Sequence, residues 1–323
     1  MQMLRAAFVR LCLLGLAVLV SGGSGAALAE DRLNPPRYLA SITGDEENEQ
    51  IRFPIEVFSD PASDELYVID SKDRAVVYTA DLFPIFTIGR KQGVQGIQSL
   101  TMDREGYVYI AVGPTKDSKK RVIAVLSPRL KLEREIVLSG FKGADTFQPY
   151  RMAIDSRGVM YVAGLYQPLV VILDPKTGQV RNTLLVEEGG KEIKVNDVAV
   201  DTEDNVYVVS EEDSHIFVYD RDQKFLFRFG DKGGSSGKLS RPMAIGIDEK
   251  RGLLYVSDFM RHTILVYAKK DGKFISEFGG LGWGDGWFQH QRDLIVDRKG
   301  RIIIADTFNN RVQIMEYNDD GVR

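Results

Sequence analysis

Short apolar runs, separated by turns rich in glycine, aspartate and charged residues, make up most of the chain. The plainest stretch covers residues 241–279, where such runs fall at 241–248, 253–258, 263–267 and 272–279. The runs are rich in branched and aromatic residues and show no helical spacing of 3.6. This pattern predicts four short strands that form one antiparallel sheet.

The same pattern occurs six times along the chain. An aspartate closes the first strand of each unit, and successive aspartates are 43 to 52 residues apart: Asp60, Asp103, Asp155, Asp201, Asp248 and Asp297. After a turn, the second strand of each unit is centred on Tyr67, Tyr109, Tyr161, Tyr207, Tyr255 and Ile303. Six units of four strands without helices predict an all-β, six-bladed β-propeller with four-stranded antiparallel blades.

The sixth unit ends after its third strand, at Tyr317. Residues 37–43, which precede the first unit, can supply its missing outer strand. Such pairing would close the ring and remove an exposed sheet edge. We therefore expect an N-terminal segment with the closing strand at residues 30–50, the propeller at residues 51–317 and a C-terminal tail at residues 318–323.

The first 29 residues have the pattern of a secretory signal peptide. Arg5 and Arg10 come before an apolar run at residues 11–20, and Ala27-Leu28-Ala29 forms a small-residue cleavage site. An uncleaved membrane anchor is the alternative, but the run is short for a span of about 20 residues. We expect export to the periplasm or the medium, with no membrane span after cleavage.

Cleavage would also change the charge and the cysteine content. It would leave 40 of the 42 basic residues against 46 acidic ones, and it would remove Cys12, the only cysteine. An acidic balance does not favour nucleic acid, which needs a basic surface. The mature chain would hold no disulfide and no thiolate metal site. We expect a monomer that does not bind nucleic acid.

The last unit resembles a known repeat family. Residues 309–313 carry the phrase Asn-x-Arg-Val-Gln, which follows the aspartates Asp297 and Asp306. This unit and the one at residues 241–279 are similar to NHL repeats, and the resemblance extends more weakly over residues 51–317. It implies a six-bladed propeller of the secreted bacterial type, in which Asp306 and Arg311 bind each other and the backbone. It implies no single activity, because the family includes interaction scaffolds, RNA binders and a few lyases.

Positions four and five before each closing aspartate should lie at the mouth of the central channel. Polar and charged residues occupy most of them, and we predict a ligand-binding site from this set: Glu56, Gln98, Arg151, Asn196, Asp197, Arg292 and Asp293. Elsewhere in the repeat the positions that face the core are mostly apolar.

Two interpretations of this set remain open. Calcium prefers oxygen ligands, and secreted lactonase-type propellers hold calcium with a set similar to Glu56, Asn196, Asp197 and Asp293. In the other interpretation, arginines neutralise the acids within a solvated channel. Because arginines repel a metal ion, we prefer the ion-paired channel and expect no cofactor, with calcium as the possible exception.

The remaining candidates are scattered along the chain. His215, His262 and His290 occupy different repeat positions, so a zinc site like that of an NHL-type amidating lyase is not expected. No serine lies in the strand-to-helix turn of a nucleophile elbow. Trp283 and Trp287 lie in a glycine-rich crossing between blades, and we predict that they form an exposed surface for a partner.

These observations favour a non-enzymatic scaffold that binds a protein or an extracellular ligand. Its binding surface would be the face where the chain enters the first strands. The alternative is a calcium- or zinc-assisted hydrolase or lyase, lactonase-like or lyase-like, with its site at the channel mouth. RNA binding conflicts with both the signal peptide and the acidic balance. No residue is predicted to be catalytic under the preferred function.

Overall fold

The computed structural model describes residues 33–318, which fall within one compact unit that begins at Leu33. The signal peptide predicted at residues 1–29 lies outside the described residues, as does the tail after residue 318. Within the described part of the chain, no helix is long and apolar enough to cross a membrane.

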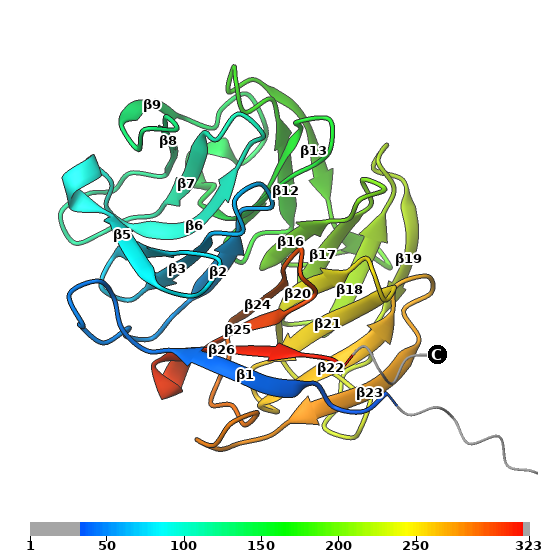
Figure 1. The fold of residues 1–323 in the computed structure, drawn as a ribbon. Helices are drawn as coiled ribbons and strands as arrows, with labels where there is room; N and C mark the ends of the chain where they lie inside the picture. The colour runs from blue at the N-terminus through cyan, green and yellow to red at the C-terminus, as the bar shows by residue number, and fades with distance from the viewer. Residues whose placement is uncertain (1–32, 319–323) are drawn as a thin grey trace, which may run out of the picture. The chain divides into compact units, whose positions relative to one another are not determined.

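Six four-stranded antiparallel sheets follow one another around a ring (Figure 1). In blade 1, from the channel outwards, the strands are β2 (Glu56–Ser59), β3 (Leu66–Asp70), β4 (Arg74–Tyr78) and β5 (Pro84–Ile88). In blade 2 they are β6 (Ile97–Met102), β7 (Val108–Val112), β8 (Val122–Leu126) and β9 (Leu132–Ile136). In blade 3 they are β10 (Pro149–Ile154), β11 (Met160–Gly164), β12 (Leu169–Leu173) and β13 (Val180–Leu185).

The second half of the ring repeats this order. The strands of blade 4 are β16 (Asp197–Val200), β17 (Val206–Ser210), β18 (His215–Tyr219) and β19 (Phe225–Phe229). Those of blade 5 are β20 (Pro242–Asp248), β21 (Leu253–Asp258), β22 (Thr263–Ala268) and β23 (Phe274–Gly279). Those of blade 6 are β24 (Asp293–Val296), β25 (Ile302–Asp306), β26 (Arg311–Glu316) and, outermost, β1 (Arg37–Ile42).

The connections hold little further regular structure. A two-stranded hairpin, which the sequence pattern did not predict, lies in the crossing from blade 3 to blade 4: β14 (Glu187–Glu188) and β15 (Lys191–Glu192). Three single 3-10 turns complete the elements of residues 33–318: η1 (Arg90–Gln92), η2 (Ala144–Thr146) and η3 (Thr307–Asn309). The prediction of an all-β, six-bladed propeller is confirmed.

The two ends of the described chain close the ring. Strand β1 pairs antiparallel with β26, with Arg37 opposite Glu316 and Ile42 opposite Val312. In Figure 1 the blue N-terminal strand lies directly beside the red C-terminal one. The N-terminal segment therefore supplies the outer strand of blade 6, as predicted, and leaves no unpaired edge on β26.

Neighbouring blades share their cores, and this explains the repeat signature. Each hydrophobic cluster joins two blades; one example packs Tyr67 and Val77 of blade 1 against Leu100 and Val108 of blade 2. In blades 2 to 5 the buried tyrosine of the second strand also donates a hydrogen bond from its hydroxyl to the closing aspartate of its own blade. The Oη–Oδ distance is 2.9 Å for Tyr109 and Asp103 and 3.1 Å for Tyr207 and Asp201.

Candidate functional site

The propeller has two faces. The inlet face is formed by the loops that lead into the first strands and by the loops between second and third strands. The outlet face is formed by the turns between first and second strands and between third and fourth strands. The central channel runs between them and is lined by the first strands.

A charged layer of Glu56, Arg151, Asp197 and Asp293 closes the channel below the inlet face. All four side chains are buried, with 3–7% of each residue exposed. Arg151 Nη1 lies 2.6 Å from Glu56 Oε2 and also donates to the carbonyl of Gln98, while Nη2 donates to the carbonyl of Ile55. Arg151 therefore joins blades 1, 2 and 3 through one guanidinium group.

The acids of the charged layer also connect neighbouring blades. Asp197 Oδ2 accepts the backbone N–H of Ile245 in the next blade at 3.1 Å. Asp293 Oδ2 accepts the N–H of Val57 at 2.8 Å across the junction between blades 6 and 1. Glu56 Oε1 accepts from the hydroxyl of Ser99 at 2.8 Å, in blade 2. The acid at this repeat position thus holds the following blade in register.

Burial governs the ionisation of the charged layer. It raises the pKa of Glu56 to about 8 and the pKa of Asp197 to about 7, although Arg151 opposes both shifts. Burial also raises the pKa of the Asp293 carboxyl. Three carboxyl groups share one arginine in a region of low dielectric constant, so the layer takes up protons near neutral pH.

The side chains of the other predicted channel residues make separate contacts. The buried Asn196 donates from Nδ2 to the carbonyl of Met243 at 2.8 Å, and its Oδ1 has no partner among the described residues. Gln98 is half-buried and faces the carbonyl of Gly96 at 3.4 Å. Arg292 lies on the inlet face, with its guanidinium carbon 5.9 Å from the ring centre of Phe259. The acids of the charged layer line the channel cavity, whereas Arg292 does not.

Three of the four candidate calcium ligands, Glu56, Asp197 and Asp293, lie in the charged layer and are engaged by other groups there. Within residues 33–318, no group of three or more histidine, cysteine, aspartate or glutamate side chains is arranged to hold a metal ion. Glu56 is already engaged by Arg151, and Asp197 and Asp293 accept backbone amides of different blades. The calcium set stays a prediction, and we derive no metal chemistry from it.

The channel contains a cavity of about 580 Å³ between the charged layer and the outlet face. Its lining residues come from the first strands and from the turns that follow them, and the described inlet loops contribute none. The charged layer therefore separates the cavity from the inlet face.

An aromatic patch on the inlet face joins blades 5, 6 and 1. Ring contacts run from Phe53 to Phe308 at 5.7 Å, from Phe308 to His290 at 4.8 Å and from His290 to Phe259 at 4.4 Å between centroids. Arg241 and Arg292 place their guanidinium carbons 5.3 and 5.9 Å from the Phe259 ring centre. These six residues define the aromatic patch. Sequence reasoning missed it; the available signal was large aromatic residues in loops rather than strands.

Two of the three histidines meet at the edge of this patch. The rings of His262 and His290 are 4.3 Å apart, and His262 Nδ1 accepts the backbone N–H of His290 at 3.0 Å. His215 lies on β18, where it contacts Arg228 and Phe217. The positions of the three histidines within the repeat did not indicate that two of them pair.

The NHL-like phrase of the last unit forms a hydrogen-bonded hub around Asp306. Its buried carboxylate accepts from Arg311 Nε at 2.8 Å, Asn309 Nδ2 at 2.8 Å and Gln313 Nε2 at 3.0 Å. It also accepts the backbone N–H of Gln289 at 2.7 Å. The prediction that Asp306 and Arg311 bind each other and the backbone is confirmed.

The same hub holds the loop that carries both tryptophans. Arg311 Nη2 donates to the carbonyls of Gly284 and Trp287, and Gln313 Nε2 also donates to Trp287. Phe288 is fully buried at the blade junction, whereas Trp283 is 77% and Trp287 50% exposed. The two indoles therefore lie on the surface, as predicted, and the partner that they would bind is a matter for proposal.

Comparison with known proteins supports the repeat interpretation over part of the chain. A family model described as a 6-bladed beta-propeller matches residues 247–323. Protein brain tumor of Drosophila melanogaster is 30% identical over 122 residues, which cover 38% of this chain and 11% of that protein. NHL repeat-containing protein 2 of Gallus gallus is 31% identical over 113 residues, covering 32% and 16% respectively. The chain thus spans only a small part of these relatives.

Solved structures agree on the architecture. An auxiliary nutrient binding protein from Bacteroides thetaiotaomicron superposes with a TM-score of 0.65 at 12% identity, over 88% of this chain and 76% of that one. The β-propeller domain of Myceliophteria thermophila Cps50 (Swd1) gives a TM-score of 0.60 at 10% identity, over 88% and 100%. At these identities the likeness shows the fold alone. The protein is a six-bladed β-propeller with NHL-repeat relatives.

Proposed function

We propose that the protein is an exported, non-enzymatic scaffold that binds a protein partner through the aromatic patch on its inlet face. The observation that carries this proposal is the continuous run of rings from Phe53 to Phe259, flanked by two arginines. Phe53 and Phe308 are 42% and 44% exposed, and the neighbouring Met260 is 52% exposed. Aromatic, methionine and arginine side chains are those that protein interfaces favour.

The charge of the patch indicates the kind of segment that would fit. Arg292 forms no ion pair with another described residue, and its Nε is buried without a hydrogen-bond partner. Arginine presents a fork of donors that matches a carboxylate. We infer that the partner inserts an acidic side chain beside an apolar one, so that the carboxylate reaches Arg292 while the apolar group covers Phe308.

The charged layer supports a scaffold rather than a hydrolase. Its acids are engaged by Arg151 and by backbone amides of the following blades. General acid–base catalysis needs a group positioned to transfer a proton, whereas the contacts of these acids join neighbouring blades. One structural neighbour is an auxiliary nutrient binding protein; that role is the neighbour's own, and it is compatible with a binding role here.

Selection of peptides from a displayed random library tests this proposal. Peptides that bind the purified protein should pair aspartate or glutamate with an apolar residue, and Arg292→Glu should weaken their binding by at least about tenfold, or 1.4 kcal/mol. Trp283→Ala, in the same experiment, tests whether the tryptophan loop extends the surface. Equal binding to the wild type and to Arg292→Glu would contradict the use of this patch.

A further inference from the structure

The wall of the channel cavity is apolar just above the outlet face. At the position before each closing aspartate, five blades place a partly exposed apolar side chain that lines the cavity: Met102, Ile154, Val200, Ile247 and Val296. Water in contact with such a wall is released when an apolar group covers it. The volume of about 580 Å³ is that of a small-molecule site.

The floor of the cavity is the charged layer, where acids outnumber bases. Glu56, Asp197, Asp293 and Arg151 all line the cavity. Both Nη atoms of Arg151 already donate hydrogen bonds, to Glu56 and to two backbone carbonyls. Within residues 33–318, Asp197 and Asp293 accept hydrogen bonds from backbone amides alone, and neither carboxylate contacts a cationic side chain.

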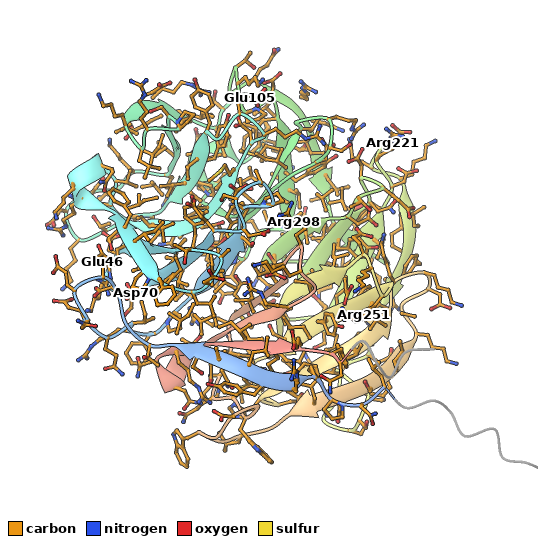
Figure 2. The ribbon with its side chains drawn as sticks, viewed as in Figure 1. Glu46, Asp70, Glu105, Arg221, Arg251 and Arg298 are labelled. Carbon is orange, nitrogen blue, oxygen red and sulfur yellow. The ribbon has the colours of Figure 1, made fainter. Side chains whose placement is uncertain are left out.

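The rim on the outlet face carries both signs of charge. Glu249, Lys250 and Arg298 line the opening. Arg298, which lies near the centre of the ring in Figure 2, is paired with Asp64 at 2.9 Å. The rim therefore does not bar a cation from the cavity, and the selectivity of the site rests on its floor and wall.

We propose that the channel cavity binds a small amphipathic ligand, with its apolar body against the aliphatic wall and one protonated amine against Asp197 and Asp293. An amine supplies both the positive charge and the N–H donors that these carboxylates lack, in a region where charge pairing is strong. An anionic ligand would bring a further acidic group beside three buried carboxyl groups. This site lies on the other side of the charged layer from the aromatic patch and goes beyond the proposed function.

Three fluorescent probes that share one apolar body test the proposal. Dansylcadaverine carries a primary amine, its N-acetyl derivative is neutral, and dansyl-6-aminohexanoic acid is anionic. The dansyl emission of the amine should rise and shift to the blue on saturable binding to the purified protein. The neutral and anionic probes should bind at least about tenfold more weakly.

Three variants test the contributions of the floor, the wall and the inlet face separately. Asp197→Asn should weaken the amine probe at least about tenfold and leave the neutral probe unchanged. Val200→Trp, which fills the outlet end and spares the charged layer, should block all three probes and decides the case if Asp197→Asn does not fold. Arg292→Glu should change nothing, so failure of this site and failure of the inlet-face partner are distinguishable. Equal affinities for the three probes, or no saturable binding, would overturn the proposal.

Discussion

Replacing Arg151 with methionine is expected to destabilise the propeller by about 3–5 kcal/mol at pH 8. Methionine fills much of the same space but leaves Glu56 without its cation and frees two backbone carbonyls in a buried layer. The free energy of unfolding, measured by urea denaturation, gives the effect. A matched change, Arg181→Met, removes an exposed pair with Asp174 and should cost about 1 kcal/mol or less.

The effect of Arg151→Met should depend on pH in a defined direction. Folded-state pKa values of about 8 for Glu56 and about 7 for Asp197 lie above the ordinary values of acids. The contribution of these two carboxyl groups to the free energy of unfolding is fully present below the ordinary pKa of an acid. It is lost as the pH rises through 7 and 8. The wild type should therefore lose stability from pH 5 to pH 9, and Arg151→Met should lose more. A variant as stable as the wild type at pH 8 would contradict a buried ion-paired layer.

Replacing Asp306 with alanine is expected to cost about 3 kcal/mol of stability and to release the tryptophan loop. Four donors lose their shared acceptor, among them the buried amide of Gln313 and the guanidinium of Arg311. Because Trp283 and Trp287 are the only tryptophans of the chain, their emission in the folded protein reports on this loop alone. The emission should move to longer wavelength.

Asp258→Ala is the matched control for this effect. Asp258 is equally buried at the same position of blade 5, where it accepts backbone amides that include those of Arg241 and Met260. Its loss should also destabilise the protein, while the tryptophan spectrum of the folded state stays as in the wild type. An unchanged spectrum in Asp306→Ala, or the same shift in Asp258→Ala, would show that the hub does not hold the loop.

The fold could be predicted because the repeat depends on residues that are close together in the sequence. In blades 2 to 5 the closing aspartate and the tyrosine of the next strand are hydrogen-bonded to each other, as Asp103 and Tyr109 are. Ring closure was predictable for the same reason, since a blade with three strands needs the fourth that residues 37–43 provide. These contacts lie within one blade or follow from counting strands.

The candidate sites were harder to predict, because their contacts join different blades. Repeat spacing predicted that Glu56, Arg151, Asp197 and Asp293 lie at one level of the channel, and all four line the same cavity. The repeat spacing could not show that Arg151 would face Glu56. Nor could it show that Asp197 and Asp293 would accept hydrogen bonds from backbone amides of the next blade. The aromatic patch joins Phe53 to Phe308 across the ring closure, and no local pattern contains that contact.

Site-specific photo-crosslinking in the cells that make the protein tests the central claim, that the inlet face holds a protein partner. Benzoylphenylalanine at position 260, beside the aromatic patch, should give one defined adduct that Arg292→Glu removes. The same group in place of Phe83, an apolar residue at the turn before β5 on the outlet face that is even more exposed than Met260, should give none. An adduct from position 83 with none from position 260, or none from either, would contradict the account.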